Sequence, residues 1–158
     1  MANHNRSVKR LAAEDYQLIE AEHARLHELL DNLRATCLNL DNELNCGSCD
    51  SEKQAACLGQ LTSSFHNLIY ITDSHFAHEE DIMRKWPYIG EQSGQFDRHR
   101  QAHAGIMTAL RKTVDDCSIL SQQGATAESY RLLYRRMSKL LEEHARLFDD
   151  PFIHSTMA

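Results

Sequence analysis

The feature that most constrains the fold is a three- and four-residue spacing of apolar residues, which continues through four long segments of the chain. Such spacing places side chains on one face of an α-helix and so predicts four amphipathic helices. The fourth segment shows the pattern most simply: its inward positions are Leu133, Met137, Leu140, His144 and Leu147. Low counts of glycine (6) and proline (2) also favour helices over turns and strands.

Two clear breaks and one weaker break separate these segments. The breaks are a cysteine-rich loop at residues 41–52, the stretch 85–94 with Pro87, and the weaker stretch 121–125. Pro151 is expected to end the last helix. The predicted helices span about residues 14–40, 53–86, 95–120 and 126–149. Because short connections join antiparallel neighbours, we expect residues 1–158 to form one all-α domain, an up-down-up-down antiparallel four-helix bundle.

Charge and hydropathy exclude several classes of partner. A formal net charge of −6 argues against nucleic acid or an anionic membrane surface as the main partner. The sequence contains no apolar run long enough to span a bilayer. The first fifteen residues contain no apolar stretch that could serve as a signal peptide. We therefore expect a cytoplasmic protein whose thiols are mostly reduced.

The apolar faces of the predicted helices are interrupted by polar residues, and most of these are histidines. A buried polar group without a partner costs about 2–7 kcal/mol. A single such histidine would be explained by a hydrogen bond within the core. Five histidines and one glutamate on four helices indicate a metal site, because a rise of about 1.5 Å per residue places all six in one layer at one end of the bundle. The six residues are His23, His75, Glu79, His99, His103 and His144.

Two spacings within this set support a shared site. His75 and Glu79 are four residues apart, as are His99 and His103, so each pair projects from one helical face. Asp149 follows His144 by five residues, about 140° further round a regular helix. It can join the site only if the last turn loosens, which Pro151 favours; otherwise it is a solvated terminal acid.

Read in order, these residues resemble the hemerythrin family. Its motif is a lone histidine followed by H-x-x-x-E, H-x-x-x-H and H-x-x-x-x-D. The stretch HFAHEEDIM, which begins at His75, is similar to bacterial members of the family. The resemblance runs from about Ile19 to Asp149. The matching positions are His23, His75, Glu79, His99, His103, His144 and Asp149.

The resemblance implies a centre of two iron ions bridged by Glu79, Asp149 and an oxo or hydroxo group. One iron would be bound by His99, His103 and His144. The other would be bound by His23 and His75 and would keep an open position for dioxygen. Imidazole and carboxylate ligands suit iron, although ligand type alone does not distinguish it from zinc or manganese. We expect the wall around bound dioxygen to include Ile19, Leu26 and Thr72.

The chain departs from the family at His27, where an aromatic residue is usual. It is interpreted as a hydrogen-bonding, pH-sensitive or merely exposed residue. The remaining histidines are expected at the surface or in flexible ends. They are His4, His66, His78 and His154.

Five cysteines form the second departure from the family. They are Cys37, Cys46, Cys49, Cys57 and Cys117, and the predicted helices place them at the end of the bundle away from the histidines. Three interpretations remain open: a second metal site holding zinc, a redox-active disulfide between Cys46 and Cys49, or ordinary buried and reduced thiols.

The function expected from this resemblance is dioxygen binding for sensing, storage or delivery, without enzymatic activity. An oxidase or peroxidase-like di-iron enzyme is the first alternative. Ferritin-like di-iron proteins use two Glu-x-x-His pairs, whereas among these core ligands only Glu20–His23 has that spacing. A redox or interaction module based on the cysteines is the second alternative. Besides dioxygen, the expected partners are an output domain in a longer signalling chain or a second copy in a homodimer.

Overall fold

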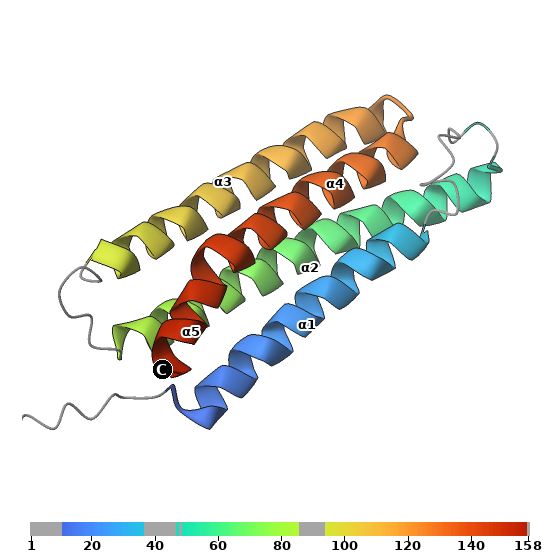
Figure 1. Ribbon diagram of the computed structural model, residues 1–158. Helices are drawn as coiled ribbons and strands as arrows, with labels where there is room; N and C mark the ends of the chain where they lie inside the picture. Colours follow the sequence, from blue (N-terminus) through green and yellow to red (C-terminus); the bar gives the residue numbers. More distant parts are fainter. Residues whose placement is uncertain (1–10, 37–46, 48, 86–93, 158) are drawn as a thin grey trace, which may run out of the picture.

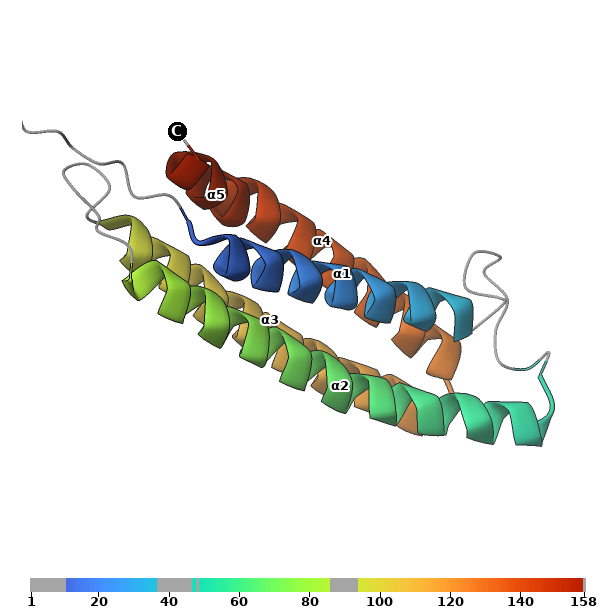
Figure 2. The same ribbon diagram turned by 90° about the horizontal axis from the view of Figure 1, so that it is seen from below.

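The computed structural model describes residues 11–36, 47, 49–85 and 94–157. Four long helices lie side by side and run alternately up and down, so the chain is an all-α antiparallel four-helix bundle, as the apolar spacing predicted (Figure 1, Figure 2). A π-helical turn and a short fifth helix follow α4. The elements are α1 (Ala13–Thr36), α2 (Ser51–Arg84), α3 (Gln95–Gln122), α4 (Thr126–His144), the π-helical turn (Ala145–Asp149) and α5 (Asp150–Met157).

Most described helix ends lie within two residues of the predicted ones. The expected continuation of the first helix to residue 40, the end of the second at residue 86 and most of the loop 41–52 lie outside the described residues. Local chemistry explains two of the observed ends. Asp50 caps α2 by accepting a hydrogen bond from the backbone N–H of Lys53 at 2.7 Å. Gly124 has a φ of 80°, a conformation that glycine adopts without strain, and so permits the short turn between α3 and α4.

The apolar core consists of two clusters at different heights along the bundle. The larger cluster joins all four long helices through residues such as Leu30, Leu61, Leu110 and Leu133. A smaller cluster lies at the end where α1 begins and α5 ends. It consists of Ile19, Ile82, Met83, Phe152 and Ile153. Two apolar clusters leave room for a polar layer that each of them shields from water on one side.

The expectation that Pro151 ends the last helix is wrong. Helix α5 continues from Asp150 to Met157, with Pro151 in its first turn. Proline is tolerated there because its missing N–H and fixed φ match the start of a helix. The N–H of Asp150 instead bonds to the carbonyl of Ala145, which is the wider i to i+5 bonding of a π-helix.

Because of the same π-helical turn, the predicted inward face of the fourth segment is wrong at its last position. Leu147, expected in the core, is 53% exposed. The wider turn rotates the residues after His144, so that Asp149 is buried instead. A regular 3.6-residue spacing therefore fails in the turn after His144.

Among the helices of the described ranges, none is both long and apolar enough to cross a bilayer. Helix α4 illustrates the reason, because Glu128, Arg135 and Lys139 lie exposed on its outer face.

We predict that Phe152→Ala destabilises the protein by about 3–5 kcal/mol, because Phe152 is fully buried at the centre of the smaller cluster. Ile119→Ala is the matched control, since this side chain is 55% exposed and its loss should change stability by less than about 0.5 kcal/mol. Urea unfolding followed by circular dichroism measures both values. Equal stability of the two variants would show that α5 does not pack as described.

Candidate metal centre

Seven polar side chains converge in the layer between the two apolar clusters. Six of them are at most 3% exposed, and the seventh, His23, has a side chain that is 23% exposed. All four long helices and the π-helical turn contribute. The residues are His23 from α1, His75 and Glu79 from α2, His99 and His103 from α3, His144 from α4 and Asp149 from the π-helical turn. The structure thus brings together all seven residues that the sequence singled out.

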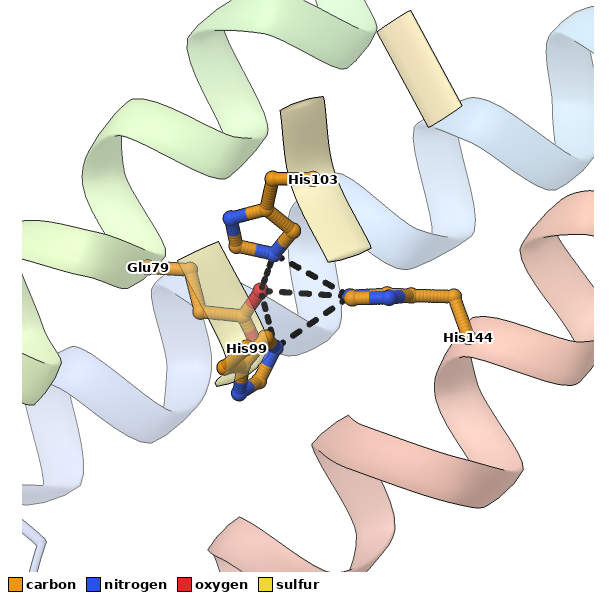
Figure 3. A group of neighbouring side chains, drawn as sticks. All are labelled: Glu79, His99, His103 and His144. Atoms are coloured by element: carbon orange, nitrogen blue, oxygen red, sulfur yellow. Dashed lines mark hydrogen bonds and ion pairs between the residues drawn. The ribbon is translucent and has the colours of Figure 1, made fainter. Parts of the chain in front are cut away.

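Four of the seven residues form a compact set, called here the four-residue group: Glu79, His99, His103 and His144. Figure 3 shows the three imidazole rings and the carboxylate pointing toward one another. Nε2 of His144 lies 3.2 Å from Nε2 of His99 and 3.1 Å from Nε2 of His103. Oε2 of Glu79 lies 3.1 Å from Nε2 of His103.

The chemistry of these atoms fits a cation. His103 donates its Nδ1–H to Glu80 at 3.0 Å, so in the neutral ring Nε2 carries a lone pair. That lone pair faces Oε2 of Glu79 and Nε2 of His144 and is repelled by other lone pairs unless a proton or a metal ion lies between them. Nitrogens bound side by side on an octahedral ion, each at about 2.1 Å, would be about 3.0 Å apart. The nitrogen separations in the four-residue group are close to this value.

The other three residues, His23, His75 and Asp149, form the three-residue group. Oδ2 of Asp149 lies 3.1 Å from Nε2 of His23. Its other oxygen, Oδ1, lies 3.1 Å from Nε2 of His99 and 2.8 Å from Nε2 of His144. The Asp149 carboxylate therefore faces both groups with one oxygen each, the arrangement of a carboxylate able to bridge two ions.

Glu79 lies between the two groups in a similar way. Its Oε2 is 3.9 Å from Nε2 of His75 in addition to its contacts in the four-residue group. Its second oxygen, Oε1, is buried and has no hydrogen-bond partner within the described ranges. A buried carboxylate oxygen without a partner is costly, and a metal ion would satisfy it.

The position of Asp149 depends on the π-helical turn. On a regular helix a residue five places after His144 would point about 140° away from it. With i to i+5 bonding over Ala145–Asp149, Asp149 returns to the face of His144, and their side chains lie 2.8 Å apart. The loosened turn on which this ligand depends is therefore present.

The histidines and carboxylates of the layer shift one another's pKa values. Burial raises the pKa of Glu79 and of Asp149, but hydrogen bonds from the histidines outweigh burial and hold both pKa values well below their usual range. Burial lowers the pKa of His144, but the Asp149 and Glu79 carboxylates outweigh it and raise that pKa to about 9. Burial lowers the pKa of His75. A metal ion would displace the protons from such a site.

A cavity of about 50 Å³ lies against the three-residue group. All three of its members line the cavity, together with His144 from the other group. Leu26, Phe76, Leu141 and Ala145 supply apolar walls, and exposed His27 also lines it. Of the expected wall residues, Leu26 is present, whereas buried Ile19 and Thr72 do not line this cavity.

Two further carboxylates, which the sequence pattern did not reveal, form hydrogen bonds with histidines of the site. They bond to the ring nitrogens that point away from the metal positions. Glu22 accepts a hydrogen bond from Nδ1 of His75 at 3.0 Å, and Glu80 accepts one from Nδ1 of His103. Partners of this kind orient a metal-binding histidine and fix its tautomer. Both lie next to a ligand in the sequence, at His23 and Glu79, and that adjacency was the available signal.

The remaining histidines are distributed as expected within the described residues. His27, His66, His78 and His154 are exposed, and His4 lies outside the described residues. His78 nevertheless has a specific contact, because its Nδ1 donates to Oε1 of Glu22 at 2.5 Å.

The three cysteines that the structure describes show no comparable convergence. Cys117 is buried, its thiol bonds to the backbone carbonyl of Ser129 at 3.2 Å, and burial raises its pKa to about 11. The potential metal-binding groups found among the described residues contain no cysteine, and Cys49 and Cys57 are half-buried. Cys37 and Cys46 lie outside the described residues. A second site built from these thiols therefore stays a prediction.

We predict that His75→Ala lowers the metal content of the purified protein by about half or more, because it removes one of only three side chains in the three-residue group. His66→Ala is the matched control on the same helix, since His66 is exposed and outside both groups. Elemental analysis of both variants and the wild type measures the effect. Equal metal content in all three proteins would contradict the assignment of His75.

Comparison with known proteins places the chain in a family. The model of the hemerythrin HHE cation-binding domain matches residues 14–152. No curated protein and no solved structure matched the chain. The family match covers both metal-binding groups and agrees with the buried cluster of histidines and carboxylates. The chain therefore belongs to the hemerythrin family.

Proposed function

We propose that the protein holds two iron ions, one in each group, and binds dioxygen as an oxygen sensor or carrier. The observation that carries this proposal is the cavity of about 50 Å³ beside the three-residue group. The group with fewer ligands is the one with adjacent space. A small ligand entering the cavity would meet the metal position that the protein leaves incompletely surrounded.

The donor set supports iron as the metal. Five imidazoles and two carboxylates surround the two positions, and non-haem iron is commonly bound by this combination. Bound iron would supply the electrons needed to hold dioxygen. Asp149 and Glu79, each facing both groups, would keep the two ions close together.

The size and lining of the cavity favour dioxygen over an organic substrate. A single water needs about 10–15 Å³, whereas pockets for organic ligands measure about 300–1,000 Å³. A cavity of about 50 Å³ suits a diatomic molecule. Its apolar walls favour a neutral ligand, and outside the seven metal-binding residues His27 is the one ionisable side chain among its described lining residues.

A larger groove of about 430 Å³ lies between α2 and α3, but it serves the proposal less well. Of the seven residues it contacts His103 alone, and Phe76 lies in its wall. The Phe76 ring stacks on His103 with ring centres 3.9 Å apart. An organic substrate in this groove would therefore meet the outer side of the four-residue group, away from the three-residue group.

We predict that Ala145→Leu slows the reaction with dioxygen by at least tenfold and leaves the iron content unchanged. The larger side chain would fill part of the cavity, and all seven metal-binding residues would remain in place. Stopped-flow absorption after mixing the reduced, iron-loaded protein with air-saturated buffer measures the rate. Ala24→Leu, at an exposed position on α1, is the matched control.

Two results would contradict the proposal. One is a wild-type protein whose reduced iron-loaded form shows no change in visible absorption with air. The other is an Ala145→Leu variant with normal iron content that reacts as fast as wild type, because the cavity would then not be the route or the site for dioxygen.

A further inference from the structure

In the histidines of the metal centre, Nδ1 points away from the metal positions, and its hydrogen-bond partner differs from one histidine to the next. Nδ1 of His75 donates to Glu22, and Nδ1 of His103 donates to Glu80. Nδ1 of His99 and of His144 is buried and has no hydrogen-bond partner in the described part of the chain. Each group therefore contains a histidine anchored by a carboxylate, His75 in one and His103 in the other.

The Glu22 anchor differs from the Glu80 anchor in the helix that it fixes. Glu22 belongs to α1, and it reaches across to His75 on α2 at 3.0 Å. The next residue, His23, is the one member of either group that α1 contributes. The Glu22–His75 hydrogen bond thus joins the two helices that carry both histidines of the three-residue group.

The second oxygen of Glu22 is also occupied. Oε1 accepts from Nδ1 of His78, one turn further along α2, while Oε2 accepts from His75. The Glu22 side chain is 16% exposed, whereas that of His78 is 49% exposed. With one hydrogen bond to each oxygen, the carboxylate cannot turn toward solvent without losing a partner.

We propose that Glu22 is a positioning residue for the metal of the three-residue group. By accepting the Nδ1–H of His75 it fixes the tautomer in which the Nε2 lone pair faces the metal position. By joining α1 to α2 it also holds His23 opposite His75. His78 supports Glu22 from the solvent side. This inference rests on the proposed metal centre but does not depend on dioxygen binding.

The test compares iron binding in a series of variants under anaerobic conditions. Competition with a coloured chelator measures the affinity for the first and second Fe(II), and elemental analysis gives the metal content. The variants are Glu22→Ala, Glu22→Gln, His78→Ala and, as the matched control, Glu28→Ala at an exposed position on the same helix. Thermal unfolding of the metal-free proteins checks that each variant folds.

We expect Glu22→Ala to weaken the second Fe(II) about 10–100-fold and to leave the first nearly unchanged. Glu22→Gln should recover most of this loss, because its amide oxygen can still accept from His75 and its size is the same. His78→Ala should cost less than fivefold, since Glu22 keeps its hydrogen bond with His75. Glu28→Ala should match wild type.

Three results would overturn the inference. Wild-type affinity for the second Fe(II) in Glu22→Ala would show that the hydrogen bond has no effect on metal binding. A loss in His78→Ala as large as that in Glu22→Ala would show that the hydrogen bond from His75 to Glu22 is not what positions the metal. An equal loss in Glu22→Gln and Glu22→Ala would show that the hydrogen bond to His75 is not the cause. A wild-type protein that binds no Fe(II) is a separate result, which would refute the metal centre itself.

Discussion

Burial of five imidazoles and two carboxylates in one layer is the constraint on which the structure depends. Such groups are costly to bury unless their charges and lone pairs are satisfied. Hydrogen bonds between the histidines and the carboxylates meet part of this need: they lower the pKa values of Glu79 and Asp149 and raise that of His144. Oε1 of Glu79 still lacks a partner within the described ranges. A cation resolves both problems, which explains why this bundle tolerates a polar layer.

The apolar clusters on either side shield most of this layer from water. The larger cluster fills the body of the bundle, and the smaller one closes the end through Phe152 and Ile153 of α5. Phe152 lies with its ring centre 6.5 Å from that of His99. The π-helical turn links the two roles of the chain's last segment, because it turns Asp149 toward the site and then starts the helix that covers it. The π-helical turn thus sets both the direction of Asp149 and the start of the helix that shields the site.

The bundle and the seven residues could be predicted because both depend on spacing. His75 with Glu79 and His99 with His103 project together from any regular helix. Asp149 could be predicted only conditionally, since its direction depends on a change of helix type. Helix α5 was missed because Pro151 was taken to end a helix, whereas it lies in the first turn of the next one. Glu22 and Glu80 were missed because exposed glutamates are common on helices, and only packing shows which of them meet a histidine.

The two groups are chemically unequal, and this inequality explains how one centre could hold metal firmly and still bind a ligand. The four-residue group contributes three imidazoles and a carboxylate, all of them at most 3% exposed, which leaves little space around its metal position. The three-residue group has fewer donors, a partly exposed His23 and the adjacent cavity. Because Asp149 and Glu79 both face the two groups, a change in charge at one metal position would act on the other through two carboxylates. Asp149 is also the last residue of the π-helical turn, so the same change would act on the start of α5. The two metal positions and the start of α5 therefore share one side chain, that of Asp149.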